Sequence, residues 1–442
     1  MIRNYLKIAL RNLQKQKIFA FINVFGLSVG IACFSLLLLY SVHEFSFDKF
    51  HKNAGDIYRV YLHEELPSSD GINASTDYSG PTPETWGEAM KKDMPDVVNF
   101  VRLQLPWGEN LVQTGNKTLR AEVGFAEQSL FTVFNFPLKY GTKTTALRNK
   151  YDIVLTASRA KQLCGTDDVV GKTVDIQLGT KDYPFTISAV ADDVPPNSTV
   201  RFDVLGSFAF INSYPQGYFN IGNNWHPIVR QTYLQLRPGS KLPGDTRQLE
   251  RFMETYEPSF VSNAKNYIAY LKKTGVNWTG KGLPESLKLQ PLLAIHTDTG
   301  FNAWGFTDYG KIDPKIVWIL LAIAAGILLI ACINFTTLAI GRSAGRSKEV
   351  GVRKVVGAAK QQIIFQFLTE ALLLSIASAI LGLLLAILLL PFFNRVAGTD
   401  LHFSFLQYPQ MDMVLTGVVL VVGLLAGSYP AFVLSGFKPL EV

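Results

Sequence analysis

The stretch IVWILLAIAAGILLIACINFTTLAI, residues 316–340, decides the fold of this chain of 442 residues. It runs for 25 residues without a charged side chain, and about 20 apolar residues suffice for a helix to cross a bilayer. Similar runs are Ile18–Tyr40, Ala371–Leu390 and Met413–Leu434. The first is too long for a signal-peptide core and no cleavage site follows it. The sequence predicts four transmembrane helices, at 18–40, 316–340, 363–391 and 413–435.

Basic residues set the orientation of these spans. Residues 1–17 carry five basic residues and no acid, and the loop 341–362 carries six against one glutamate. Residues 41–315, in contrast, carry 29 basic and 30 acidic residues. Because short loops rich in lysine and arginine stay cytosolic, we expect both termini (1–17 and 436–442) and the loop 341–362 inside. Residues 41–315 and 392–412 then lie outside, and the net charge of +7 belongs to the membrane face and does not indicate nucleic-acid binding.

The stretch GTDDVVGKT, residues 165–173, resembles a phosphate-binding loop but departs from it in spacing and context. Five residues separate Gly165 from Gly171, where such a loop has four. Residues 155–163 read as a helix and 173–178 as a strand, whereas a phosphate-binding loop runs from strand to helix. The stretch also lies on the side of the membrane away from ATP. We therefore predict that this chain is not an ATPase.

The outer region reads as an α+β domain of two lobes. Strand-like and helical segments alternate as strand, helix, strand near its start and again near its end. The first set is 56–62, 83–94 and 97–105, and the second is 231–236, 245–256 and 286–293. Between them lie further strands, at 173–178 and 183–190. This order predicts a base lobe (about 45–109 and 229–312) with a distal β-rich lobe (about 110–228) inserted into it.

The outer region carries no pattern of catalytic or metal-binding residues. The six histidines do not have metal-ligand spacing and no Gly-x-Ser-x-Gly occurs. Cys33 and Cys332 lie in predicted spans, which leaves Cys164 without a partner for a disulfide in the outer domain. Four phenylalanines cluster within twelve residues, at 125, 131, 134 and 136, and are either core residues or an aromatic surface for substrate.

Two cytosolic segments have helical patterns. Residues 2–17 have apolar side chains at helical spacing beside basic ones, which is typical of a helix at the membrane surface. In SKEVGVRKVVGA, residues 347–358, Glu349 and Arg353 stand four apart in the favourable order, and Gly357 can end the helix. Val352, Val355 and Val356 form an apolar strip on it. This short helix needs either the membrane or a protein partner to cover that strip.

Several motifs resemble the FtsX/MacB-type ABC transporter permeases. The stretch 343–358 is similar to the ATPase-coupling segment of that family. Other similar motifs are Ala9–Leu13, Asn23–Leu27, Gly124–Phe131, Ile153–Thr173, Cys332–Phe335, Phe367–Glu370 and Tyr429–Pro439. They span the whole chain in the family's order, with the same layout of one span, a large outer domain and three spans.

This resemblance implies a permease subunit that binds no cofactor itself, with ATP and magnesium in a partner ATPase. The coupling residues would be Ser347, Lys348, Glu349, Val350, Gly351, Val352, Arg353, Lys354 and Gly357. The localisation implied is the bacterial inner membrane, with the large domain in the periplasm. Movement driven by ATP would reach the outer domain and act in export or extraction of lipoprotein, peptide or toxic compound. A periplasmic adaptor or lipoprotein is a further candidate partner.

Small and polar residues in the spans suit the transmission of such a movement across the membrane. The pairs Gly26 and Gly30, and Gly423 and Gly427, stand four apart and offer surfaces for close helix packing, unless they serve bends or face lipid. Asn334 and Glu370 are polar residues within or beside spans, where a carboxylate is costly. Glu370 either pairs with Arg353 or Lys354, or reaches the interface.

Many relatives of this type are about twice as long, so the chain is either half of a duplicated permease or a unit that pairs with itself. We expect a dimeric permease in both cases. Two other classes of function compete with transport. A signalling or scaffold protein with a ligand-binding outer domain would need no ATPase at the 348–357 helix, and a membrane-anchored hydrolase would need a catalytic set that the sequence does not show.

Overall fold

The computed structural model describes residues 17–67, 74–104, 108–115, 117–211, 230–275, 283–301, 310–345, 350, 352, 355–357, 359–403, 413–424 and 428. The chain divides into two compact units. The helical unit comprises residues 1–45 and 314–442, and the outer domain comprises residues 46–313.

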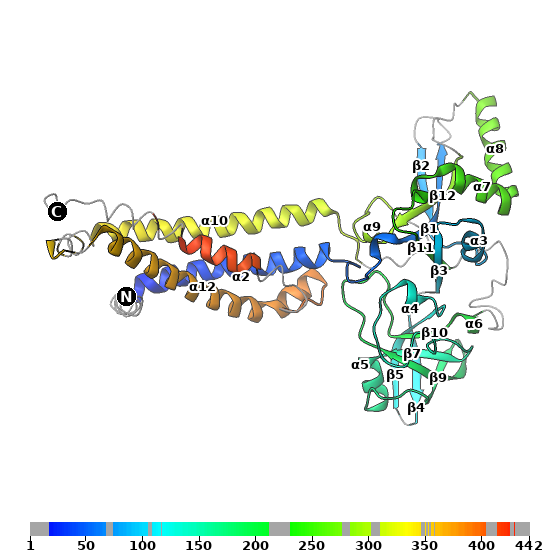
Figure 1. Ribbon diagram of the computed structural model, residues 1–442, viewed down its shortest axis with the longest axis horizontal. Coiled ribbons are helices and arrows are strands. Elements are labelled where there is room, and N and C mark those ends of the chain that lie inside the picture. Colours follow the sequence, from blue (N-terminus) through cyan, green and yellow to red (C-terminus); the bar gives the residue numbers. More distant parts are fainter. Residues whose placement is uncertain are drawn as a thin grey trace. The chain divides into compact units, whose positions relative to one another are not determined.

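Long apolar helices make up the helical unit (Figure 1). They are α2 (Lys17–Phe45), α10 (Pro314–Gly345) and α12 (Lys360–Ala397), and each is long and apolar enough to cross a membrane. Helix α2 packs against both α10 and α12. A shorter apolar helix, Met413–Leu424, occupies the first half of the fourth predicted span. The rest of that span, apart from Ser428, lies outside the described residues, so the fourth crossing stays a prediction.

The outer domain contains a mixed sheet of 12 strands among its described residues. The path of hydrogen-bonded neighbours is β10-β7-β9-β8-β4-β5-β3-β11-β1-β12, with β2 beside β1 and β6 beside β9. The strands are β1 (Ile57–Pro67), β2 (Ala74–Ser79), β3 (Val97–Gln104), β4 (Glu109–Thr114), β5 (Lys117–Ala126), β6 (Leu138–Tyr140), β7 (Asp152–Thr156), β8 (Thr173–Leu178), β9 (Lys181–Ala191), β10 (Val204–Ser207), β11 (Gln231–Leu236) and β12 (Glu285–Pro291).

Short helices join and cover these strands. They are η1 (Ala54–Asp56), α3 (Trp86–Asp93), α4 (Leu130–Val133), α5 (Ala157–Cys164), α6 (Phe208–Ile211), η2 (Leu242–Gly244), α7 (Thr246–Tyr256), α8 (Pro258–Lys273) and α9 (Leu292–Ile295). The α+β class predicted from the sequence is therefore confirmed. Strands from residues 109–207 occupy one half of the sheet path and strands from the flanking segments the other. The division into two lobes stays a prediction.

Most predicted elements occur, but several of their ends are shifted. The strand predicted at 56–62 continues to Pro67, and the helix predicted at 83–94 begins at Trp86. The helix expected at 155–163 begins only at Ala157, because Leu155 and Thr156 belong to β7, whose five residues are all buried. The strand expected at 286–293 ends at Pro291, after which Leu292 starts α9. The nucleotide-like stretch at 165–173 is a turn from α5 into β8, as predicted. Gly165 has a φ of +78° there, in the left-handed region that suits glycine.

Apolar side chains form separate clusters along the sheet. One, around Val112, Phe185 and Ile187, lies in the half built from residues 109–207. Another, around Val60, Trp86 and Phe252, lies in the other half. A third includes Phe131, Phe134 and Phe136, which are at most 2% exposed, and Phe125 is also buried. Of the two alternatives for the phenylalanine cluster, the structure therefore supports core packing.

Candidate functional site: the coupling segment and the membrane junction

The coupling segment is described only in part. Ser347, Lys348, Glu349, Gly351, Arg353 and Lys354 lie outside the described residues, as does the predicted helix at 2–17 except for Lys17. Val350 is 3% exposed and packs with Ile363 and Phe367 at the start of α12. In contrast, the valines of the predicted strip at 352, 355 and 356 are 64–82% exposed.

A helical turn ends at Gly357. The Val356 N–H donates a hydrogen bond to the Val352 carbonyl at 3.1 Å, and Gly357 has a φ of +97°. This agrees with the predicted helix end. The exposed valines therefore sit on a short turn that Val350 fixes to α12.

The glycines predicted for helix packing lie at different distances from neighbouring helices. A Cβ atom at Gly30 would be 2.6 Å from Cβ of Ala331 on α10, whereas one at Gly26 would be 3.4 Å from Nδ2 of Asn334. A Cβ atom at Gly423 would be 3.0 Å from Cδ1 of Leu372 on α12. Gly427 lies outside the described residues.

The close approach of α2 and α12 was not predicted from the sequence. A Cβ atom at Gly382 would be 2.8 Å from the Ser28 carbonyl oxygen, and the Ser28 hydroxyl donates to the Ser378 carbonyl at 3.0 Å. The serines and alanines that precede Gly382 in its span are the signal that could have indicated this contact. Helix α2 thus makes tight contacts with two different helices.

The predicted polar residues of the spans have different surroundings. Asn334 is exposed on the protein surface, and Glu370 is 7% exposed. The Gln366 amide donates a hydrogen bond to Glu370 Oε1 at 3.3 Å. Because Arg353 and Lys354 are outside the described residues, the pairing predicted for Glu370 stays a prediction. Asn23 of α2, which was not singled out as a polar site, is 1% exposed.

The outer domain has a buried polar cluster where the chain leaves the first predicted span. Helix α2 ends at Phe45, and Asp48 follows with a φ of +57° and no exposed surface. The Thr199 N–H donates to Asp48 Oδ1 at 2.8 Å, and the Thr199 hydroxyl donates to Oδ2. The loop from β9 to β10, which contains Thr199, is therefore hydrogen-bonded to the segment by which the chain enters the outer domain, residues 46–48 (the entry segment).

Further bonds join the same two segments. The Asp48 N–H donates to the Asn197 carbonyl at 2.9 Å. The Asn197 side-chain amide donates to the Ser46 hydroxyl at 2.9 Å and to the Ser46 carbonyl at 3.1 Å. Ser46 and Asp48 of the entry segment are thus held by backbone and side-chain groups of one loop.

His51 lies within the aromatic core beside this contact. Its Nδ1 accepts the Asn135 N–H at 3.0 Å, and the rings of Phe134 and Phe136 lie edge-on at about 5 Å. Its Nε2 is 4.0 Å from Asp48 Oδ1, which is too long for a hydrogen bond. Burial lowers the pKa of His51 to about 3 and raises the pKa of Asp48 to about 6, against the opposing effect of the Thr199 bonds. The imidazole is therefore neutral at pH 7.

His296 ties the exit of the domain to its entry. Its ring stacks on Phe47, with centroids 3.3 Å apart and planes 3° from parallel. Its carbonyl accepts the N–H of Ile312 at 3.1 Å, two residues before α10 begins. We call Phe47, Asp48, His51, Asn197, Thr199 and His296 the membrane junction. From the sequence, the two histidines could be described only as lacking metal-ligand spacing. Their contacts at the junction could not be predicted, because a single sequence does not show which distant segments meet.

Comparison with known proteins agrees with this architecture. Residues 20–252 match the MacB-like periplasmic core domain, and residues 320–439 match the FtsX-like permease C-terminal domain. The chain belongs to the FtsX/MacB-type ABC transporter permease family. The resemblance noted in the sequence is thereby confirmed. This family, together with the apolar helices, indicates an inner-membrane protein with a periplasmic domain.

Two family members with curated descriptions are similar over part of the chain. The macrolide export ATP-binding/permease protein MacB of Bdellovibrio bacteriovorus is 29% identical over 145 residues, which are 32% of this chain and 22% of that protein. The MacB protein of Rhodopirellula baltica is 23% identical over 288 residues, 62% of this chain and 40% of that protein. The matches thus span less than half of these relatives. The solved periplasmic region of MacB from Actinobacillus actinomycetemcomitans has 12% identity and a TM-score of 0.32, and covers 46% of this chain and 85% of that structure.

Proposed function

We propose that this chain is the transmembrane permease subunit of an ABC transporter, and that ATP is hydrolysed by a partner ATPase. The observation that carries the proposal is the membrane junction. The loop at 194–199 and the segment at 46–48 share buried hydrogen bonds, and His296 contacts both chain connections to the spans. A displacement of the first span along its axis would therefore reach the outer domain through directional, water-excluded contacts.

In this mechanism the coupling segment receives the movement. Its three exposed valines offer an apolar surface to the ATPase, while Val350 transmits motion to α12. Glu349, Arg353 and Lys354 would add charged contacts to the same partner. The contacts at Gly30 and Gly382 would keep α2 moving together with α10 and α12. Both termini are cytosolic in this arrangement, and four spans from each of two permease units complete the membrane part.

The work done on the periplasmic side is export or extraction of a lipoprotein, peptide or toxic compound. The curated relatives are macrolide export proteins by name, which supports export of a compound. A periplasmic adaptor or a lipoprotein is the further partner that such a mechanism would use.

Two measurements on the chain purified from its native membranes test the proposal. The first is co-purification of an ATPase with the wild type, with Glu349→Arg, and with Glu254→Arg as a matched charge reversal on exposed α7. We expect the ATPase with the wild type and Glu254→Arg and its loss with Glu349→Arg. Absence of an ATPase from all three would overturn the permease assignment and favour the signalling or scaffold alternative.

The second measurement addresses transmission in the captured complex. Hydrogen exchange is followed at 46–56 and 194–202, with and without ATP and vanadate, and strand β8 serves as the internal reference. We expect a change in exchange at both junction segments and none in β8. If the ATPase binds but the junction segments exchange equally in both states, the chain is a permease whose outer domain is driven by another route.

A further inference from the structure

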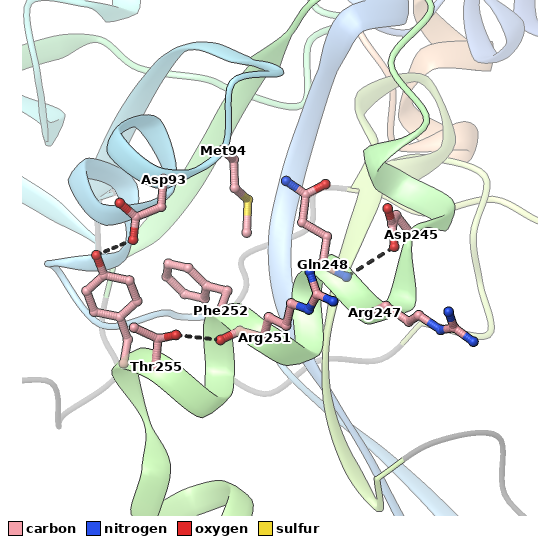
Figure 2. A pocket seen from close by; sticks show the side chains of 9 residues that line it. Asp93, Met94, Asp245, Arg247, Gln248, Arg251, Phe252 and Thr255 are labelled. Carbon is pink, nitrogen blue, oxygen red and sulfur yellow. Dashed lines mark hydrogen bonds between the residues drawn. The ribbon is translucent and has the colours of Figure 1, made fainter.

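A cavity of about 440 Å³ lies between α7 and the end of α3 in the outer domain (Figure 2). Its apolar lining is provided by Met94 and Phe252, which are 2% and 4% exposed. The volume falls within the range of small-molecule sites, roughly 300–1,000 Å³. The cavity shares no residue with the membrane junction or the coupling segment.

Two arginines line the cavity from one side of α7. Arg247 and Arg251 are four residues apart, so their side chains leave the same face of the helix. Both are exposed, and neither guanidinium forms a hydrogen bond or an ion pair with any residue that the structure describes. Figure 2 shows Arg247, Gln248 and Arg251 along α7, with Met94 and Phe252 between this part of the helix and Asp93.

The two acidic residues of the cavity are engaged by neutral donors. Asp93 accepts the Tyr256 hydroxyl at 2.5 Å, and Asp245 caps α7 by accepting the Gln248 N–H at 3.1 Å. Figure 2 shows both bonds, and neither carboxylate forms an ion pair with Arg247 or Arg251. The cavity therefore combines a small apolar patch with two carboxylates and two guanidiniums, and the guanidiniums form no ion pair with any residue that the structure describes.

We propose that this cavity binds a carboxylate that is attached to an apolar group. A guanidinium presents paired N–H donors in a plane, which matches the two oxygens of a carboxylate. Asp93 and Asp245 also line the cavity, and their negative charges would penalise a doubly charged phosphate more than a singly charged carboxylate. Met94 and Phe252 would contact the apolar part. The carboxylate comes either from a small free acid or from an acidic side chain of a peptide, and the same chemistry recognises both.

The test uses the full chain in lipid nanodiscs with ¹³C-labelled methionine methyl groups. The chain has six methionines, and the Met94 resonance is assigned with Met94→Leu. The first probe is 3-phenylpropanoate, and the neutral 3-phenylpropanamide is its control. The second is a blocked tripeptide of phenylalanine, glutamate and leucine, with the glutamine tripeptide as its control. We expect a carboxylate probe to shift the Met94 methyl resonance at millimolar concentration and its amide counterpart to leave it unchanged.

Matched variants separate this site from diffuse attraction by positive charge. Arg247→Gln with Arg251→Gln removes two positive charges from the cavity, and Lys272→Gln with Lys273→Gln removes two from the exposed end of α8. We expect the arginine pair to weaken binding about tenfold or more, as for loss of charged hydrogen bonds, and the lysine pair to leave it unchanged. A shift with the tripeptide identifies a peptide ligand, and a shift with the free acid alone identifies a small acid.

Three results would overturn the proposal. These are the absence of a Met94 shift with both carboxylate probes, an equal shift with the amides, and equal weakening by the two double variants. The proposal does not depend on the transport function, because none of these measurements involves the ATPase.

Discussion

Replacing Asp48 by asparagine tests the electrostatics of the membrane junction. Asparagine keeps the shape of the side chain and, like aspartate, tolerates the left-handed backbone found here, with a φ of +57°. Its carbonyl oxygen can still accept the Thr199 N–H that Asp48 Oδ1 accepts at 2.8 Å. The Nδ2 group of asparagine can only donate, so the Thr199 hydroxyl, which donates to Oδ2 in the wild type, must accept from Nδ2 in the variant. The substitution therefore removes the titration of the side chain and keeps both contacts to Thr199, one of them with its direction reversed.

The two buried groups of the junction respond to pH with opposite signs. The pKa of Asp48 is raised from 3.8 to about 6, so the folded state binds this proton more tightly than the unfolded state does. The contribution of Asp48 to stability therefore falls as the pH rises from about 4 to about 6. At about 1.4 kcal/mol per pKa unit, the loss is about 3 kcal/mol. The pKa of His51 is lowered from 6.5 to about 3, so its contribution rises with pH from about 3 to 6.5.

In the wild type these contributions nearly cancel between pH 4 and 6. Asp48→Asn removes the contribution that falls with rising pH. Between pH 4 and pH 6, the stability of the junction should therefore rise with pH by about 3 kcal/mol relative to the wild type. His51→Asn keeps an acceptor for the Asn135 N–H and removes the rising contribution, so its junction should lose about 3 kcal/mol over the same interval. Each expected difference concerns how stability changes with pH, so a packing cost that is the same at every pH does not affect it.

The assay is hydrogen exchange at the Thr199 amide and its neighbours in the full chain, from pH 4 to 7. Exchange rates are corrected for their intrinsic pH dependence and converted to a free energy of local opening. The reference is the free energy of opening of strand β8, which should show the same pH dependence in all three proteins. Parallel curves for wild type and Asp48→Asn at the junction would refute the reasoning, because they would mean that burial does not shift the titration of Asp48.

Three further substitutions probe packing. Gly30→Val should lower the stability of the purified chain by about 1–3 kcal/mol through overpacking, while Gly326→Val, with no atom within 4 Å of its added Cβ, should leave the melting temperature unchanged. Arg102→Met should cost about 3–5 kcal/mol because it removes the cation from Glu127, 2.5 Å from the guanidinium, and from buried Glu84 at 3.9 Å. Adding Glu127→Leu should recover only part of that loss, because Glu84 stays without the Arg102 cation, and no recovery in denaturant unfolding would contradict it. Phe134→Ala should cost about 3–5 kcal/mol, whereas a cost below 1 kcal/mol would mean that the cavity collapses.

Elements with a strong local pattern could be predicted from the sequence. Strand β8 was predicted at its observed bounds, Thr173–Leu178, because apolar residues alternate there. Helix α7 was predicted with Asp245 at its start, and that side chain caps the helix. Two of the boundaries that shifted, at Thr156 and Leu292, are places where a strand passes directly into a helix with no loop between them. Periodicity alone does not mark such a change.

For the candidate site, the sequence could identify a contiguous segment but not the contacts between residues that are far apart in the chain. The coupling segment could be singled out because its charges, valines and glycine are adjacent in sequence. The membrane junction could not, because Asp48 and Thr199 are 151 residues apart. No property of either residue alone indicates the other. The lowered pKa of His51 could not be predicted for the same reason, since it comes from burial by distant parts of the chain.

The position of the junction in the sheet explains how one short segment can act on the whole outer domain. The segment at 46–56 continues into β1, which pairs with β11 and β12 in one half of the sheet path. Its side chains and backbone also hold the loop between β9 and β10, which belong to the other half. A movement of this segment therefore reaches one half through the covalent chain and the other through buried hydrogen bonds. Thr199→Val removes the hydroxyl bond to Asp48 Oδ2 and leaves the Thr199 N–H bond and the Asn197 bonds in place. It should therefore weaken the second connection and leave the first intact, which faster hydrogen exchange at 194–202 with unchanged exchange in β1 would show.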